Sequence, residues 1–264
     1  MENKYIKYIE RVVKNNFIPL KPRKINEIYD FLSGKNFDVG LVLNLEDIDK
    51  KKELRDKKLI PIISGKKIIH VGCVDHLELI EEKIKKNEWL HKILSENAKE
   101  CVGIDISKNG IEYMKEKLNY KDVFCCDLLK PNVRKITQEN FDYMVLGEII
   151  EHVENPYNFL LQINTLYKEN VSKIIITTPN AFSYNNFVNA KNGFEVINSD
   201  HKTIFSPYTL IKILFMSGYK IEKIDFANPT FKIWHKIINT IIRQIIFSNK
   251  ITLSNTIIIT ASFK

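Results

Sequence analysis

The sequence FDYMVLGEIIEHVENP, residues 141–156, holds the pattern that decides the fold. Its apolar run from Tyr143 to Leu146 is typical of a parallel strand that is buried on both faces. The run ends at Gly147 and Glu148, where polar side chains begin. In open sheets of parallel strands, ligands bind beyond the carboxyl ends of the strands, so we expect a functional site at this point.

Three polar side chains follow the run at helical spacing. Glu151 and His152 come three and four positions after Glu148, so one helical turn would place two carboxylates and an imidazole on one face. Acidic residues are also favoured in the first turn of any helix, and Glu154 would belong to the same solvated cap. The spacing alone leaves both interpretations open.

Outward from this stretch, the chain alternates apolar runs with amphipathic segments from Lys66 onward, which predicts an α/β fold with a doubly wound parallel sheet. Residues 66–264 are expected to form this domain, and residues 1–65 a small α-rich accessory segment that acts as a lid, an oligomer contact or padding. The expected strands are 67–71, 100–104, 123–126, 143–146, 173–178, 219–226 and 255–263. The expected helices include 77–94, 107–118, 157–167 and 207–216.

Two further segments have recognisable patterns. Residues 181–205 are rich in Asn and aromatic residues and too long for a simple connector, so we expect them to carry binding groups. Residues 231–247 place six isoleucines on one helical face, a stripe that suits packing within the protein or in a homodimer better than contact with a membrane surface.

Composition narrows the possible partners. The net charge is 40 − 32 = +8, yet residues 136–167 contain no Lys or Arg and several acids, so the expected site is acidic within a basic molecule. Basic and acidic residues alternate elsewhere, which argues against nucleic acid as a partner. The four cysteines follow no CxxC or disulfide-framework spacing, and no apolar signal region or run of membrane-spanning length occurs. We therefore expect a reduced, cytoplasmic protein with no transmembrane segment.

Three of the expected strands end in residues suited to a nucleotide-like cofactor. Gly72 follows the first strand and allows close backbone approach to a ligand. Asp105 follows the second strand, where its carboxylate can accept hydrogen bonds from a ribose diol, and Asp127 follows the third, within reach of an adenine amino group. Each Asp alone would be an ordinary loop residue, but together they trace a cofactor across the carboxyl edge of the sheet.

With these residues in place, the sequence resembles the class I S-adenosylmethionine-dependent methyltransferases over residues 66–264. The motifs that carry the resemblance are IIHVGC at 68–73, VGIDIS at 102–107, CCDLL at 125–129, LGEIIEHVENP at 146–156 and KIIITTPN at 173–180. The resemblance implies a Rossmann-like, seven-stranded, mostly parallel sheet with helices on both faces and an antiparallel closing strand. The implied reaction uses S-adenosylmethionine and leaves S-adenosylhomocysteine.

The resemblance also assigns residues to parts of the cofactor. Gly72 and Cys73 would line the methionine end, and Asp105 would hold the ribose. Asp127 and Leu128 would flank the adenine, and Gly147 and Glu148 would pass beneath the sulfonium. His70 and Ile106 complete the predicted cofactor-binding set.

The first motif departs from the family pattern. It carries fewer glycines than usual, and His70, Val74 and His76 occupy places where acidic or small residues are common in the family. Bulky Val74 puts the usual backbone approach to the methionine moiety in question. This variant is similar to one in methyltransferases of bacterial capsule and surface-polysaccharide clusters, and the post-strand-four helical turn also resembles that of quinone O-methyltransferases.

The expected catalytic residues are His152, His201 and Glu148. An imidazole titrates near neutral pH and suits a general base toward an oxygen acceptor. The set Glu148, Glu151, His152 and His201 also resembles the metal site of small-RNA 3′-end 2′-O-methyltransferases, and its donors would suit Mg²⁺ or Mn²⁺.

The expected acceptor is an oxygen on a small molecule or saccharide, in bacterial surface-polysaccharide biosynthesis. Three rivals remain open: a metal-dependent RNA 2′-O-methyltransferase, a dinucleotide-dependent oxidoreductase and an inactive scaffold. The oxidoreductase requires a GxGxxG turn, of which only Gly72 is present. The scaffold would be marked by failure to bind the cofactor, with Val74 as the cause.

Overall fold

The structure is a computed structural model that describes residues 22–38, 40–45, 51, 53–228 and 251–264. The chain divides into two compact units, Met1–Ile48 and Asp49–Lys264. Residues 1–21 of the expected α-rich segment and the isoleucine stripe of residues 231–247 lie outside the described residues. The separate roles expected for residues 1–65 and 66–264 stay a prediction.

The first unit holds a small parallel pair of strands, β1 (Pro22–Arg23) and β2 (Val42–Leu43). Between them lie a 3₁₀ helix, η2 (Ile25–Ile28), and a short helix, α2 (Tyr29–Leu32). The Arg23 guanidinium lies 4.5 Å from the centre of the Phe31 ring and pairs with Asp38 at 3.8 Å. This cation–π contact and ion pair tie β1 to α2 and to the loop after it.

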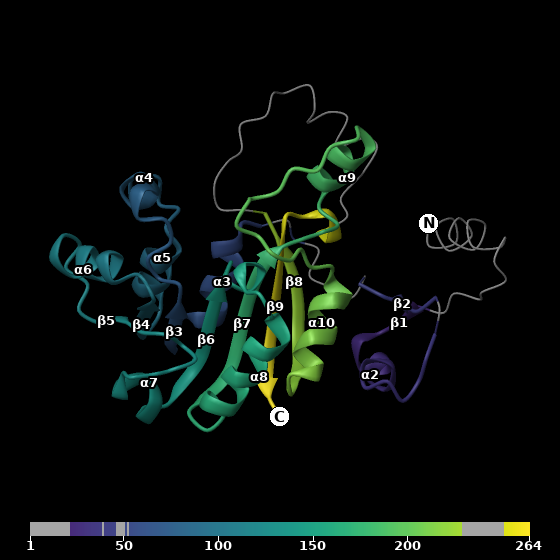
Figure 1. The fold of residues 1–264 in the computed structure, drawn as a ribbon, viewed down its shortest axis with the longest axis horizontal. Helices are drawn as coiled ribbons and strands as arrows, with labels where there is room; N and C mark the ends of the chain where they lie inside the picture. The colour runs from purple at the N-terminus through teal and green to yellow at the C-terminus, as the bar shows by residue number, and fades with distance from the viewer. Residues whose placement is uncertain (1–21, 39, 46–50, 52, 229–250) are drawn as a thin grey trace. The chain divides into compact units, whose positions relative to one another are not determined.

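The second unit is built on a seven-stranded sheet with the order β5-β4-β3-β6-β7-β9-β8 (Figure 1). The five strands from β5 to β7 are parallel, and β9 runs antiparallel to both of its neighbours. The prediction of a Rossmann-like, mostly parallel sheet with an antiparallel closing strand is confirmed. The strands are β3 (Lys67–Val71), β4 (Glu100–Asp105), β5 (Val123–Cys125), β6 (Phe141–Gly147), β7 (Val171–Pro179), β8 (Tyr219–Ala227) and β9 (Thr256–Phe263).

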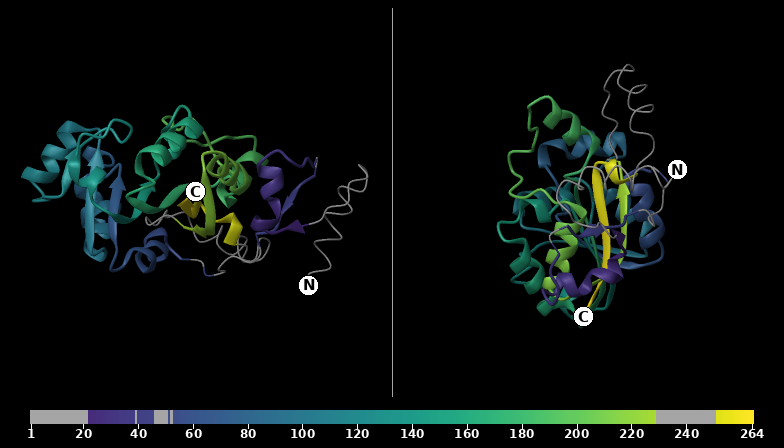
Figure 2. Two further views of the ribbon diagram at one scale, coloured as in Figure 1. Left: turned by 90° about the horizontal axis from the view of Figure 1, so that it is seen from below. Right: turned by 90° about the vertical axis from the view of Figure 1, so that its right-hand side faces the viewer.

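Helices cover both faces of this sheet. In Figure 1, α8 (Pro156–Tyr167) and α10 (Pro207–Met216) lie in front of the sheet and α3 (Arg55–Ile63) lies behind it, and the views in Figure 2 show the same layers. The other elements are η3 (Leu77–Leu79), α4 (Ile80–Lys86), α5 (Leu90–Asn97), α6 (Lys108–Glu116), α7 (Arg134–Gln138), η4 (Ile150–His152), α9 (Tyr184–Lys191) and η5 (Ile251–Leu253).

Two helices begin as the sequence predicts. Ser107 and Ser206 each accept a hydrogen bond from the backbone N–H three positions later, at the start of α6 and α10. Each side chain satisfies a donor that the first helical turn leaves without a partner. The prediction of one helix over residues 77–94 was wrong, because Asn87 takes a left-handed conformation (φ 55°) that ends α4 before α5 begins.

The helix α3, which precedes the first strand of the sheet, is packed into the core of the second unit. Leu59 and Ile63 of α3 contact Leu94 of α5 and the buried side chains of the central strands. Lys58 pairs with Asp225 of β8 at 3.2 Å, and both side chains are buried. Since each charge compensates the other away from water, this ion pair fixes α3 on the sheet.

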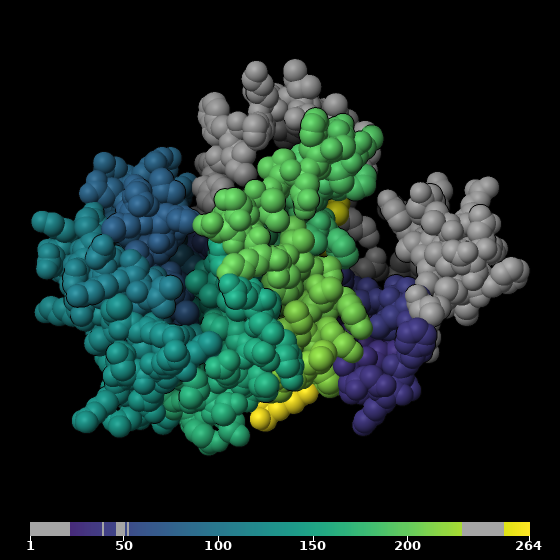
Figure 3. All heavy atoms as spheres, viewed as in Figure 1, coloured from purple at the N-terminus to yellow at the C-terminus, as the bar shows by residue number. Residues whose placement is uncertain are grey.

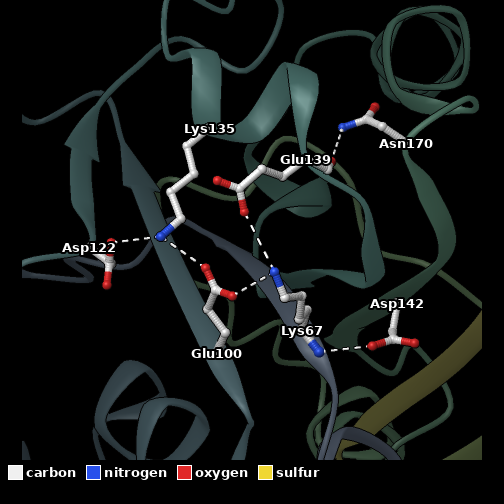
Figure 4. Close-up of polar contacts among 7 residues, drawn as sticks. All are labelled: Lys67, Glu100, Asp122, Lys135, Glu139, Asp142 and Asn170. Carbon is white, nitrogen blue, oxygen red and sulfur yellow. Dashed lines mark hydrogen bonds and ion pairs between the residues drawn. The ribbon is translucent and has the colours of Figure 1, made fainter.

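A charged network joins strands at the amino edge of the sheet (Figure 4). Glu100 of β4 accepts from Lys67 at 2.9 Å and from Lys135 at 2.8 Å, and Lys135 also pairs with Asp122 at 2.9 Å. Lys67 reaches Glu139 at 3.5 Å. The network lies at the edge opposite to the carboxyl ends, so it contributes to the sheet rather than to the site.

No helix among the described residues is long and apolar enough to cross a membrane.

Candidate active site

The loop after β3 is held tightly against β4. Gly72 has a φ of 72°, and its N–H and that of Cys73 both donate to the carbonyl of Ile104, at 2.9 and 3.2 Å. A Cβ atom on Gly72 would lie 2.3 Å from Cδ1 of Ile149. The left-handed backbone favours glycine at this position, and any larger residue would also displace the end of the Ile149 side chain.

Asp105 connects this loop to the end of β4. One carboxylate oxygen accepts from the N–H of Val74 at 3.0 Å, and the other accepts from the N–H of Ser107 at 2.9 Å. Each oxygen of an ionised carboxylate accepts about two hydrogen bonds, so each keeps capacity for a ligand hydroxyl. The neighbouring Ile106 side chain is 79% exposed. A carboxylate with spare acceptor capacity beside an exposed apolar side chain fits a ribose and an adenine.

Val74 and Cys73 point into the core. Both side chains are buried and pack with Ile111 and Met114 of α6. Gly110 makes room for Val74, because a Cβ atom on Gly110 would lie 2.3 Å from a Val74 methyl group. The bulk of Val74 is therefore absorbed by α6 and does not stand over the loop.

The predicted adenine residues follow β5. Asp127 is exposed, and its Oδ1 accepts from the N–H of Leu129 at 2.9 Å. Leu128 is buried, and its carbonyl accepts from the Tyr167 hydroxyl at 2.8 Å. Tyr167 of α8 thus anchors this loop through its hydroxyl group.

The turn after β6 differs from the predicted helical turn. Glu148 has a φ of 57° and precedes the short 3₁₀ helix η4, so Glu148, Glu151 and His152 do not share one helical face. A left-handed conformation at a residue with a Cβ atom costs roughly 1 kcal/mol and persists where other contacts hold it. Here the Glu148 N–H donates to the carbonyl of Thr177 at 3.0 Å.

The Glu148 carboxylate is held by two partners. Its Oε1 accepts from the Thr177 hydroxyl at 3.0 Å and pairs with the Arg55 guanidinium at 3.3 Å. The N–H of Arg55 donates to the carbonyl of Asn228, at the end of β8. Sequence reasoning missed Arg55, because it lies before the first strand, in a segment without a motif.

Glu151 is a buried carboxyl group at the centre of the site. It is 1% exposed, Oε2 accepts from the Thr178 hydroxyl at 3.0 Å, and Oε1 has no partner among the described residues. Burial, with the nearby Glu148 charge, raises the pKa of Glu151 to about 8. Glu151 is therefore largely protonated at neutral pH unless a cation lies beside it.

The segment after β7 returns to this carboxyl group and brings a histidine with it. The N–H groups of Lys202 and Thr203 donate to the carbonyl of Glu151, at 2.8 and 3.2 Å. The His201 ring then lies edge-on to His152, with 4.8 Å between ring centres. Burial, with the neighbouring His152, lowers the pKa of His201, which favours the neutral imidazole.

Glu151, His152 and His201 offer one ligand atom each within 4.8 Å of one another. A carboxylate and two imidazoles on one side of a site can hold a divalent metal, and the two nitrogen donors suit Mn²⁺ better than Mg²⁺. The orphaned oxygen of Glu151 is the observation that fits a cation. The fourth predicted ligand, Glu148, is bound by Arg55 and Thr177 and is not part of this group.

His70 lies beneath the site rather than in it. Its side chain is buried, and its Nδ1 lies 3.1 Å from Nδ1 of His91, with the two rings stacked. Burial holds the pKa of His70 well below its usual value and lowers that of His91 to about 4. Both rings are therefore neutral, and one donates to the other. Sequence reasoning missed His91, which lies in the interrupted helical region.

The chain matches a family of known proteins over most of its length. The sequence model described as "Methyltransferase domain" matches residues 46–224. No curated protein matches the chain.

Solved structures are similar to the chain at low sequence identity. A S-adenosylmethionine-dependent methyltransferase from Archaeoglobus fulgidus is 20% identical, with a TM-score of 0.48 over 79% of this chain and 91% of that one. The small RNA methyltransferase HEN1 is 16% identical, with a TM-score of 0.51 over 80% of this chain and 25% of that one. The chain thus spans about a quarter of the length of HEN1. A complex of Haloferax volcanii holds the Trm112 methyltransferase activator and a methyltransferase, and its match is 12% identical, with a TM-score of 0.50 over 79% of this chain and 93% of that one.

Proposed function

The chain belongs to the methyltransferase-domain family and is a class I S-adenosylmethionine-dependent methyltransferase, and we propose that its acceptor is a hydroxyl group on a small molecule or saccharide. The cofactor supplies an electrophilic methyl group on its sulfonium. Asp105 accepts hydrogen bonds from the ribose, and Ile106 packs on the adenine, with Asp127 and Leu128 at the far end of the same sheet edge.

The observation that carries the proposed acceptor chemistry is the position of the His201 ring, edge-on to His152 with 4.8 Å between ring centres. A neutral imidazole can take a proton from a hydroxyl group as the oxygen attacks, and His152 lies close enough to orient it. Arg55 and Thr177 hold the Glu148 carboxylate at the turn after β6. In methyl transfer, alignment of the attacking oxygen with the methyl group supplies much of the rate. Side chains that are held in fixed positions favour this alignment.

The first-motif variant with His70 and Val74 supports a place in bacterial capsule or surface-polysaccharide assembly. The structure gives Val74 a packing role against Gly110, which removes the reason to infer lost cofactor binding from this residue. A catalytically active enzyme is therefore favoured over a scaffold.

Calorimetric titration with S-adenosylhomocysteine tests the cofactor site. We expect micromolar binding by the native protein and at least about a tenfold loss in Asp105→Ala, because the ribose loses its acceptor. Asp122→Ala, which removes an aspartate at the opposite edge of the sheet, should bind as the native protein does. Equal binding by Asp105→Ala would contradict the proposed register of the cofactor.

A second candidate is a metal-dependent RNA 2′-O-methyltransferase, and the cluster of Glu151, His152 and His201 favours it. HEN1, which shares the fold, is a small RNA methyltransferase. This function requires activity on RNA that depends on Mn²⁺ and falls steeply with salt, since phosphate contacts release counterions. Methyl transfer to a saccharide hydroxyl, with no RNA activity at low salt, would exclude it.

A further inference from the structure

Half of the large apolar side chains that stand exposed in the described part of the chain lie between residues 181 and 205. They are Phe182 (55% exposed), Phe187 (49%), Phe194 (67%), Val196 (69%), Ile197 (47%) and Ile204 (41%). The helix α9 in this segment buries none of its residues. The folded chain therefore gains little from these side chains, and a ligand is the simpler reason for an apolar group of this size.

Residues 181–205 form a long insertion after β7, and the two ends of this insertion are hydrogen-bonded to each other beside the active site. The N–H of Ala181 donates to the carbonyl of Phe205 at 2.9 Å, and Asn180 pairs with Phe205. Its later part returns to Glu151 through Lys202 and Thr203 and places His201 beside His152. Figure 1 shows α9 standing beyond the carboxyl end of β7, and Figure 3 shows the segment across the face turned to the viewer, next to a hollow that separates it from α4 to α6. The exposed apolar side chains thus belong to the same segment that brings His201 to the site.

The charge of residues 181–205 indicates which kind of ligand their exposed apolar side chains bind. Between residues 181 and 205 the chain carries two basic side chains, Lys191 and Lys202, and two acidic ones, Glu195 and Asp200. Surfaces that bind anionic lipid or nucleic acid gather Lys and Arg around their apolar or aromatic residues. Because the charges of this segment balance, we expect it to bind an uncharged apolar group. The segment leads directly to His201, so we expect that group to be part of the methyl acceptor.

We propose that Phe194, Val196 and Ile197, four to seven residues before His201, bind an uncharged alkyl chain of the methyl acceptor. The acceptor is then an amphiphile, with its hydroxyl group at His201 and its apolar chain along residues 194–197. This inference rests on the proposed function, because it names the class of acceptor for the same site.

The test compares the affinities of n-octyl β-D-glucoside and methyl β-D-glucoside for the protein. Both are measured with S-adenosylhomocysteine present, and the octyl compound is kept below its micellar concentration. We expect the octyl compound to bind the native protein about tenfold or more tightly than the methyl compound, and F194S/I197S to lose that difference. A matched control, F37S/L166S, removes one exposed Phe and one exposed aliphatic side chain elsewhere and should keep it.

The titration with S-adenosylhomocysteine separates the two possible failures. If all variants bind S-adenosylhomocysteine equally but the octyl compound binds no better than the methyl compound, the apolar subsite is wrong and the methyltransferase site stands. If the native protein fails to bind S-adenosylhomocysteine, the proposed function itself fails. Binding of the native protein to neutral lipid vesicles, or a dimer that F194S/I197S dissociates, would overturn the proposal in favour of a membrane or a second copy of the chain.

Discussion

At the scale of single residues, Glu151 has the most consequential environment in the site. Its carboxyl group is buried, its pKa is raised to about 8, and one oxygen lacks a partner among the described residues. In the unfolded chain the same group loses its proton near pH 4.5. Between these two pH values the folded protein holds a proton that the unfolded chain has released.

This difference predicts a stability that falls as pH rises. Between about pH 4.5 and 8, the free energy of unfolding should decrease by up to about 1.4 kcal/mol per pH unit from Glu151, and Glu151→Gln should remove that slope. Urea unfolding at pH 5.5, 6.5 and 7.5 measures the free energy of unfolding of the native protein and of Glu151→Gln.

Binding of Mn²⁺ at the proposed metal site should remove the proton that the folded protein holds on Glu151. A bound cation keeps Glu151 deprotonated, so binding at pH 7 should release about one proton. Calorimetry in two buffers that differ in their enthalpy of ionisation counts the protons. Binding without proton release, or equal binding by Glu151→Gln, would speak against Glu151 as a ligand.

The pair of His70 and His91 should respond to pH in the opposite direction. Burial lowers the pKa of both rings in the folded protein, so the unfolded chain binds more protons below about pH 6.5. Stability should therefore be lost as pH falls from 6.5 toward 4.

Substitution isolates the contact between the two rings. His91→Leu leaves Nδ1 of His70 without its partner and should cost about 1–3 kcal/mol. His70→Leu/His91→Leu should cost less than the sum of the two single changes, by roughly 1 kcal/mol or more, and should lose the acid sensitivity. Strict additivity in a double-mutant cycle would show that the hydrogen bond contributes nothing.

At the scale of elements, α6 and the loop after β3 pack against each other through Gly110 of α6 and Val74 of the loop. Gly110 lacks the Cβ atom that would lie 2.3 Å from Val74. Gly110→Ala should therefore destabilise the protein by about 1–3 kcal/mol, although alanine in an exposed helix usually stabilises relative to glycine.

A second substitution checks the reason. Val74→Ala/Gly110→Ala should recover most of the stability that Gly110→Ala loses, because the methyl groups that clash are gone. Thermal unfolding of the native protein, both single variants and the pair gives the comparison. Failure of Val74→Ala to rescue Gly110→Ala would place the strain elsewhere.

The elements also show how far sequence reasoning reaches. Strands β3, β6 and β7 could be predicted because buried parallel strands are continuous apolar runs, and α10 because Ser206, Pro207 and Gly218 mark its ends. The break at Asn87 could not, because a single left-handed Asn lacks a strong signal beside good helix formers. The contacts of Glu148 with Arg55 and Thr177 depend on segments distant in sequence, so spacing within residues 148–152 could not reveal them.

At the scale of the whole molecule, α3 belongs with the sheet. A chain that begins at Asp49 should fold and bind S-adenosylhomocysteine, because it keeps Arg55, Lys58 and the apolar face of α3. A chain that begins at Lys66 loses Lys58 and the apolar face of α3, and leaves Lys223 as the ion-pair partner of Asp225. We expect that chain to be unfolded or to bind no S-adenosylhomocysteine. Circular dichroism and calorimetry of both chains give the answer, and equal stability would show that α3 is dispensable.

The position of β9 in the sheet has a consequence for how the protein is made. In chain order β9 comes after every other described strand, yet it lies between β7 and β8. While the ribosome still holds residues 256–263, β8 has no neighbour in the sheet, and β7 exposes the edge that β9 will cover. Folding of the sheet can therefore be completed only after those residues emerge, and until then both edges are open to wrong partners, so a chaperone that binds extended apolar strands has its target here.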